Sequence, residues 1–164
     1  MKMLYLVGGP MGVGKTAVCQ RLKRALPNSV FLDGDWCWDA DPFQVTAETR
    51  AMVLGNIRHL LGNFLRCTAY ETVIFCWVMD RQDILDNVLA GLDLSGCRVV
   101  PVSLTASEEA LTERIRADVA AGRRGPGAAE QSLARLPLYR DLNTIKIDTT
   151  GRSIPEICRE IAAL

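Results

Sequence analysis

The residues with the clearest chemical potential form an eight-residue segment close to the N-terminus. It matches the pattern G-x-x-x-x-G-K-[ST] at every fixed position and consists of Gly9, Pro10, Met11, Gly12, Val13, Gly14, Lys15 and Thr16. Glycines let a backbone wrap around a phosphate chain so that successive N–H groups point at it. In this pattern the lysine reaches the β- and γ-phosphates, and the threonine hydroxyl binds Mg²⁺. The segment therefore predicts a site for a nucleoside triphosphate.

The flanking residues have the pattern that such a loop requires. Residues 3–7 form a short apolar run typical of a buried parallel strand, and residues 16–26 place apolar side chains at helical spacing until Pro27. A loop between a strand and a helix lies at the positive end of the helix, where an anion is stabilised. We therefore expect the phosphates to contact residues 9–17, which includes Ala17 in the first helical turn.

A pair of acids follows the second predicted strand, residues 29–32. Asp33 and Asp35 flank Gly34, and in an extended chain their side chains point to similar sides. One carboxylate can then serve a metal ion while the other meets the hydroxyl of a phosphoryl acceptor. The alternative is a polar turn whose carboxylates only bind nearby backbone N–H groups.

Three aromatic residues follow this turn in a predicted loop, and they are costly to leave in water. Trp36, Trp38 and Phe43 either line an acceptor pocket or pack the loop under the next helix. The sequence does not say which of them line a pocket.

Two further groups carry charge near the predicted ligand edge. Asp80 follows an apolar run at 72–79 and is a second candidate for the Mg²⁺ shell, and its neighbour Arg81 is a candidate contact for an anionic acceptor.

Arg123 and Arg124 lie in a glycine-rich stretch at 121–130. Arginines on a mobile flap can close over a triphosphate and neutralise developing charge. The alternative is a solvated helix face followed by a disordered loop.

Strands and helices alternate along the chain, which predicts a three-layer, doubly wound parallel sheet of five strands. The expected strands cover 3–7, 29–32, 72–79, 97–104 and 144–148, and the main helices begin near residues 16, 46, 80, 107, 130 and 153. In such sheets ligands bind at the carboxyl ends of the strands, where the glycine loop and the acid pair both lie.

Composition narrows the classes of function. The chain has 164 residues, which suits a single domain over 1–164, and its formal net charge is zero. Zero net charge argues against broad capture of nucleic acid or of an anionic membrane. The six cysteines form no C-x-x-C motif, and no apolar run approaches the length of a membrane span. We expect reduced thiols, no signal peptide and a cytoplasmic location.

These motifs together resemble those of the P-loop kinase superfamily, which includes adenylate, shikimate, gluconate and adenylylsulfate kinases. The resemblance spans nearly the whole chain and rests on the glycine loop, Asp33-Gly34-Asp35, the Leu111-x-x-Arg114 pair, the arginine-bearing segment and Ile147-Asp148-Thr149-Thr150. It implies the strand order 2-3-1-4-5 and a lid at about 121–137.

The resemblance also implies roles for individual residues. Arg114 would stack on adenine beside the loop around Thr150, and Arg123 and Arg124 would grip phosphates. Asp33 would join Thr16 in the metal shell, and Asp35 would bind the acceptor or act as its base.

The chain departs from the better-known members of the superfamily, and this leaves the acceptor open. No Asp-Gly-x-Pro-Arg follows the third strand, where residues 76–81 stand instead, and there is no triple glycine of the shikimate kinase type. We expect an ATP-dependent, Mg²⁺-requiring phosphotransferase acting on a hydroxyl or phosphate of a small molecule, as a monomer or homodimer. A nucleoside or nucleotide kinase is one alternative, and a nucleotide-dependent switch or NTPase acting through a protein partner is another.

Overall fold

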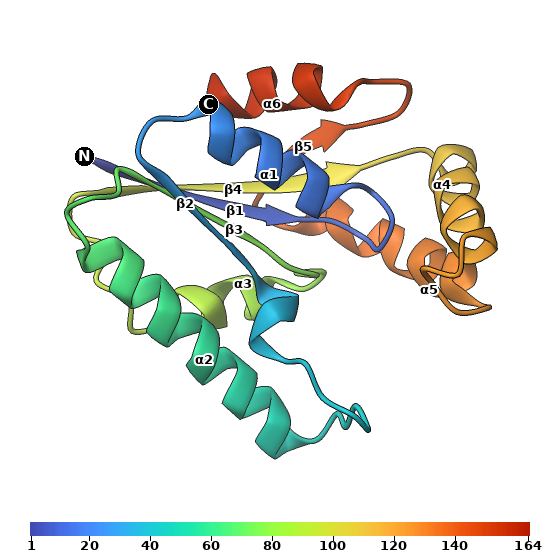
Figure 1. The fold of residues 1–164 in the computed structure, drawn as a ribbon, viewed down its shortest axis with the longest axis horizontal. Coiled ribbons are helices and arrows are strands. Elements are labelled where there is room, and N and C mark those ends of the chain that lie inside the picture. The colour runs from blue at the N-terminus through green and yellow to red at the C-terminus, as the bar shows by residue number, and fades with distance from the viewer.

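The computed structural model describes all residues, 1–164, and shows a central sheet between layers of helices (Figure 1). The strands are β1 (Lys2–Gly8), β2 (Ser29–Asp33), β3 (Thr72–Cys76), β4 (Cys97–Thr105) and β5 (Ile145–Asp148). The helices are α1 (Lys15–Ala25), α2 (Ala47–Arg66), α3 (Gln82–Leu89), α4 (Glu108–Ala120), α5 (Ala128–Arg135) and α6 (Ile154–Ala162), with short 3₁₀ turns η1 (Gly34–Cys37) and η2 (Leu136–Asp141).

All five strands are parallel and lie in the order β2-β3-β1-β4-β5, as expected. The central strand β1 is apolar along its length because both faces of the sheet are covered. Leu4 and Leu6 point to the layer that holds α2 and α3, whereas Tyr5 and Val7 point to the layer that holds α1 and α6. This alternation fixes the register of the sheet between its two cores.

Side chains cap the N-termini of α2 and α6. Thr46 accepts from the backbone N–H of Thr49 before α2, and Ser153 forms a capping box with Glu156 before α6. These side chains satisfy backbone donors that the first helical turn leaves free. No helix combines the length and the apolar composition that a membrane crossing requires.

The third strand is shorter than predicted. The apolar run at 72–79 suggested a strand over its full length, but β3 ends at Cys76. The chain then leaves the sheet: Trp77 packs against Gly34, and Asp80 forms an ion pair outside the sheet. Apolar composition alone cannot distinguish a strand from the buried loop that continues it.

The carboxyl ends of β1, β2 and β3 form the edge on which the site is built. The glycine loop follows β1, the acid pair lies at the end of β2, and Trp77 follows β3. Strand order reverses at β1, which pairs with β3 on one side and β4 on the other. Such a switch point leaves a crevice for a ligand.

Candidate active site

The glycine loop and the start of α1 form a pocket of the kind that holds phosphate. Gly14, which precedes α1, provides no side-chain cap, so the N–H groups of the first turn stay available to a ligand. Gly12 has a φ of +83°, and a Cβ there would lie 2.5 Å from Ile115 Cγ1 of α4. Only glycine fits this position, because both the backbone conformation and the close approach of α4 exclude a side chain.

Lys15 spans the loop from the start of α1. Its ammonium group donates hydrogen bonds to the carbonyl of Gly9 at 2.8 Å and to that of Pro10 at 3.0 Å. Partial removal from water lowers the pKa of Lys15, and the nearby carboxylates of Asp35 and Asp33 oppose that shift. An added phosphate chain would strengthen this opposing effect and favour the charged ammonium.

Thr16 and Asp33 meet at the foot of the loop. The Thr16 hydroxyl donates to Asp33 Oδ2 at 2.8 Å, and Asp33 is buried. A hydroxyl and a carboxylate are hard oxygen donors of the kind that Mg²⁺ prefers, and the ion usually keeps several waters and binds substrate phosphates. These two residues therefore fit the metal site predicted from the sequence.

Asp35 lies in η1, two residues after Asp33. Its backbone N–H donates to Asp33 Oδ1 at 3.0 Å, so the two acids are held in a fixed relation. Loss of hydration and the neighbouring charge of Asp33 raise the pKa of Asp35, while Lys15 and the adjacent Trp77 side chain counteract the rise. A carboxylate with a raised pKa is better suited to accept a proton.

Gly34 allows Trp77 to reach Asp35. A Cβ at Gly34 would lie 2.5 Å from Trp77 Cγ, so the indole packs directly on the glycine backbone. The apolar run at 72–79 predicts Trp77 inside a strand, and this contact arises because β3 ends one residue earlier, at Cys76.

The opposite side of the glycine loop is bounded by Arg114. Its guanidinium donates to Thr149 Oγ1 at 2.9 Å and to the Thr149 carbonyl at 3.0 Å, and it also reaches the Val13 carbonyl at 3.4 Å. The Thr150 hydroxyl accepts from the backbone N–H of Ser107 at 2.8 Å. Arg114 and Thr150 thus lie where the loop meets the β5–α6 connection, the position expected for a nucleotide base.

The two arginines of the predicted lid have different surroundings. Both pair with Asp118, Arg123 at 2.8 Å and Arg124 at 3.0 Å, and the segment after α4 is a short connection that ends where α5 begins at Ala128. Arg124 is close enough to the loop for its charge to lower the pKa values of Lys15 and Asp35. Arg123 is the more exposed of the two, with 66% of its side chain accessible against 30% for Arg124.

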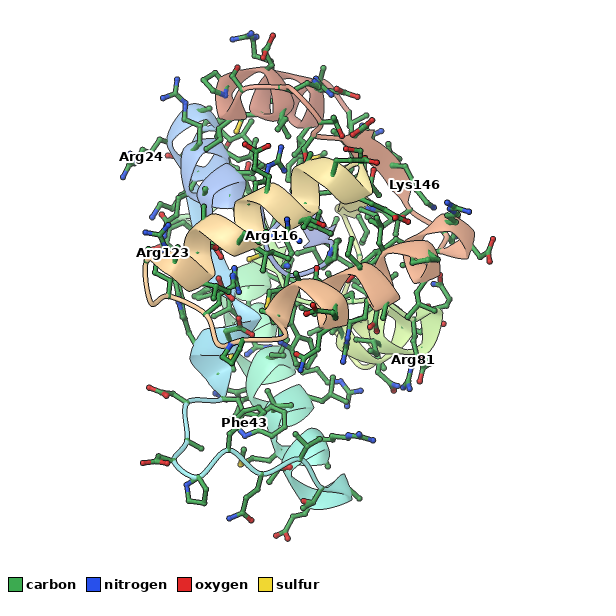
Figure 2. All side chains as sticks on the ribbon, turned by 90° about the vertical axis from the view of Figure 1, so that its right-hand side faces the viewer. Arg24, Phe43, Arg81, Arg116, Arg123 and Lys146 are labelled. Carbon is green, nitrogen blue, oxygen red and sulfur yellow. The ribbon has the colours of Figure 1, made fainter.

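A cleft of about 1000 Å³ opens beside Asp35, and Arg114 does not line it. Its walls come from the loop before α2, from α2 and α3, and from α5 with η2. Figure 2 looks onto this edge of the sheet, with Phe43 on the loop before α2 and Arg81 at the start of α3. The lining includes Met11 of the glycine loop, so the cleft is continuous with the predicted triphosphate site.

The structure separates the three aromatic residues of the loop. Trp38 and Phe43 line the cleft, with ring centroids 4.4 Å apart. Trp36 packs instead against Phe31, with centroids 5.2 Å apart, and does not reach the cleft.

Asp80 and Arg81 also line the cleft, but each has a partner of its own. Asp80 is buried and pairs with Arg135 at 2.7 Å, and Arg81 forms a two-pronged pair with Asp83 at 2.8 and 2.9 Å. Asp33, rather than Asp80, is the acid in contact with Thr16. No local pattern in the sequence indicates a role for Arg135, because its partner lies 55 residues earlier in the chain.

A family model described as an AAA domain matches residues 6–131, more than half of the chain. The chain belongs to this AAA domain family. No curated protein matches the chain.

The fold of this AAA domain is similar to that of several solved structures. A tunicamycin resistance protein of Deinococcus radiodurans has a TM-score of 0.77 and 22% identity over 99% of this chain and 95% of its own. A gluconokinase of Sinorhizobium meliloti has a TM-score of 0.67 and 23% identity over 97% and 89%. A shikimate kinase of Acinetobacter baumannii has a TM-score of 0.63 and 20% identity over 99% and 91%. The fold expected from the resemblance to P-loop kinases is thereby confirmed.

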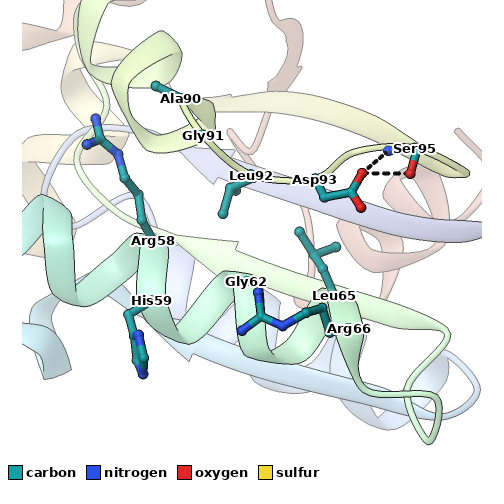
Figure 3. Close-up of a pocket in the computed structure, with 10 residues that line it drawn as sticks. All are labelled: Arg58, His59, Gly62, Leu65, Arg66, Ala90, Gly91, Leu92, Asp93 and Ser95. Atoms are coloured by element: carbon teal, nitrogen blue, oxygen red, sulfur yellow. Dashed lines mark hydrogen bonds between the residues drawn. The ribbon is translucent and has the colours of Figure 1, made fainter.

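The AAA domain has a second hollow of about 410 Å³, between the C-terminal half of α2 and the connection from α3 to β4 (Figure 3). Arg58, His59 and Arg66 border it, and Asp93 accepts two hydrogen bonds from Ser95 there. These segments precede β3 and β4, so the hollow lies at the amino ends of the strands, opposite the glycine loop. It is no part of the candidate active site.

Proposed function

We propose that the protein is a phosphotransferase that moves the γ-phosphoryl group of Mg-ATP to a small-molecule acceptor. One observation carries this proposal: Asp35 joins the two halves of the site. Its backbone binds Asp33, which binds Thr16 of the triphosphate loop, and its side chain lines the neighbouring cleft. A transferring enzyme needs this adjacency of donor and acceptor.

Different residues of the site contribute to different parts of the transfer. The glycine loop and the first turn of α1 hold the phosphates, and Lys15 and Arg124 supply positive charge where charge develops. Asp33 and Thr16 would hold Mg²⁺, which neutralises phosphate charge when bound. Asp35 orients the acceptor hydroxyl and accepts its proton.

A kinase assignment is supported by the similar structures, which include a gluconokinase and a shikimate kinase. The cleft supports transfer over a switch acting through a protein partner, because a switch needs no second ligand site beside its nucleotide. A nucleoside or nucleotide kinase remains within the proposal as a choice of acceptor.

The test is ADP release from Mg-ATP with and without a panel of small alcohols, in the wild type and in Lys15→Ala. The proposal predicts release that depends on an acceptor and on Lys15. Equal release by Lys15→Ala would contradict it.

A further inference from the structure

We propose that the acceptor is an uncharged alcohol with an apolar, ring-bearing body, rather than a small anionic sugar acid. The inference rests on the proposed function and adds the chemical class of the acceptor. It is drawn from the lining and the charges of the cleft beside Asp35.

The cleft exposes apolar side chains that a bound apolar group would cover. Phe43 is 58% exposed, Val45 54% and Leu138 47%, and all three border the cleft. Phe43 and Val45 come from the loop before α2, and Leu138 comes from η2. Apolar side chains gathered around one cleft gain free energy when a ligand removes them from water.

Aromatic residues shape two parts of this lining. Trp38 and Phe43 form one aromatic wall with their rings tilted by 39°, and Trp77 lies beside Asp35. Flat rings offer a large apolar area with little loss of conformational freedom, and they bind other rings in offset or edge-on geometry. The volume of about 1000 Å³ exceeds what a single sugar acid fills.

The charges in the cleft cancel, so a carboxylate would find little to bind. Three arginines and three acids line it: Arg50, Arg81, Arg135, Asp35, Asp80 and Asp83. Arg135 is held by Asp80 and Arg81 by Asp83. Of the three arginines, Arg50 alone has no ion pair. It lies on an exposed turn of α2, where a single ion pair with a bound carboxylate contributes little to affinity.

The proposed orientation places the hydroxyl of the acceptor at Asp35 and the apolar body between Phe43, Val45 and Leu138. In the transfer step the bond between the γ-phosphorus and the bridging oxygen breaks, and ADP leaves with that oxygen. The hydroxyl oxygen of the acceptor forms the new bond to phosphorus, and its proton passes to the Asp35 carboxylate.

The test compares two probes of one shape, 3-phenyl-1-propanol and 4-(3-hydroxypropyl)benzoate, which differ only in a carboxylate. Binding is measured by calorimetry on the full chain with Mg²⁺ and a non-hydrolysable ATP analogue. We expect the neutral probe to bind at least about five-fold more tightly, because the carboxylate must lose water without gaining a free cation. Equal or tighter binding of the carboxylate probe overturns the proposal.

Two variants make the comparison specific to the cleft. Val45→Asp should weaken the neutral probe at least about five-fold through lost apolar contact and added charge. Met52→Asp is the matched control, because Met52 is 46% exposed on α2 but does not border the cleft. Equal effects of the two variants would show that the probe binds elsewhere and would overturn the proposal.

A third variant tests the cancellation of charge itself. Asp83→Asn frees Arg81, and both side chains are exposed, so the fold should tolerate the change. The carboxylate probe should then bind about two- to five-fold more tightly, with no gain for the neutral probe. If the affinity of the carboxylate probe is unchanged in Asp83→Asn, pairing of charges does not keep carboxylates from the cleft, and the proposal is overturned.

Failure of the acceptor class is distinguishable from failure of the proposed function. If the ATP analogue binds and Lys15→Ala weakens it, while the carboxylate probe binds better than the neutral one, only the acceptor class is wrong. If Lys15→Ala leaves binding of the analogue unchanged, the phosphotransferase proposal fails, and the acceptor class that rests on it fails too.

Discussion

At the scale of single residues, Asp35 links the geometry of the site to a measurable pH dependence. Burial and the charge of Asp33 raise the pKa of Asp35 above the ordinary aspartate value. A base works only when ionised, so kcat/KM should fall as the pH is lowered through this raised pKa. Asp35→Asn should lose this acid limb and turn over ~10²-fold more slowly or worse, with ATP affinity little changed. Collapse of ATP binding in this variant would assign Asp35 to the metal shell instead.

The raised pKa of Asp35 also predicts whether its ionised form stabilises or destabilises the fold. The folded-state pKa of Asp35 lies above its unfolded value, so its ionised form destabilises the fold at neutral pH, and this cost disappears below the unfolded pKa. Asp35→Asn should therefore melt at or above the wild-type temperature at pH 7, with the difference vanishing in acid. Thermal unfolding followed by circular dichroism measures this. A lower melting temperature at pH 7 would mean that the lost activity reflects a damaged fold.

Arg123 and Arg124 are adjacent in sequence but should differ in function. The charge of Arg124 lowers the pKa values of Lys15 and Asp35, and the Arg123 side chain is 66% exposed against 30% for Arg124. Arg124→Ala should lower turnover by roughly ten-fold or more and ATP affinity by less, because its charge acts on the moving phosphoryl group. Arg123→Ala serves as the control, and steady-state kinetics compares the two. Similar losses in both variants would show that the pair acts as a unit on a lid.

At the scale of elements, the end of β3 positions the acceptor side of the site. Gly34→Ala would place a Cβ 2.5 Å from Trp77 Cγ and force the indole away from Asp35. Turnover should fall at least about ten-fold while ATP affinity is kept, because the change misorients a group that acts on the acceptor. Gly55→Ala on α2 is the matched control, since a Cβ there meets nothing within 4 Å. Equal kinetics in the two variants would show that Trp77 does not help to orient Asp35.

The elements that the sequence predicted well are those with local signals. The five strands and the glycine loop follow from short patterns, and the strand order follows from the resemblance. The resemblance implies a shared metal shell for Thr16 and Asp33, and the hydrogen bond that joins them directly is seen only in the structure. The end of β3, the packing of Trp77 on Gly34 and the pair of Asp80 with Arg135 were not predictable, because each joins segments far apart in the chain.

At the scale of the whole molecule, the topology brings two ligand sites to one edge of the sheet. The triphosphate loop follows β1, and the cleft lies between the layer of α2 and α3 and the helices α5 and η2. Asp35 stands at their junction because β2 and β3 end beside each other, with Asp33 opposite Cys76 in the sheet. Water at this junction would compete with an acceptor for the phosphoryl group.

Whether the protein transfers the γ-phosphoryl group to an alcohol is decided by identifying the product by mass spectrometry, with ADP measured in the same samples. The protein is incubated with Mg-ATP and a panel of neutral aromatic alcohols. We expect one or more alcohols carrying a single added phosphoryl group, formed in equal amount to ADP by the wild type and absent in Lys15→Ala. ADP and free phosphate formed at one rate with every alcohol and with none, and no phosphorylated alcohol, would contradict it.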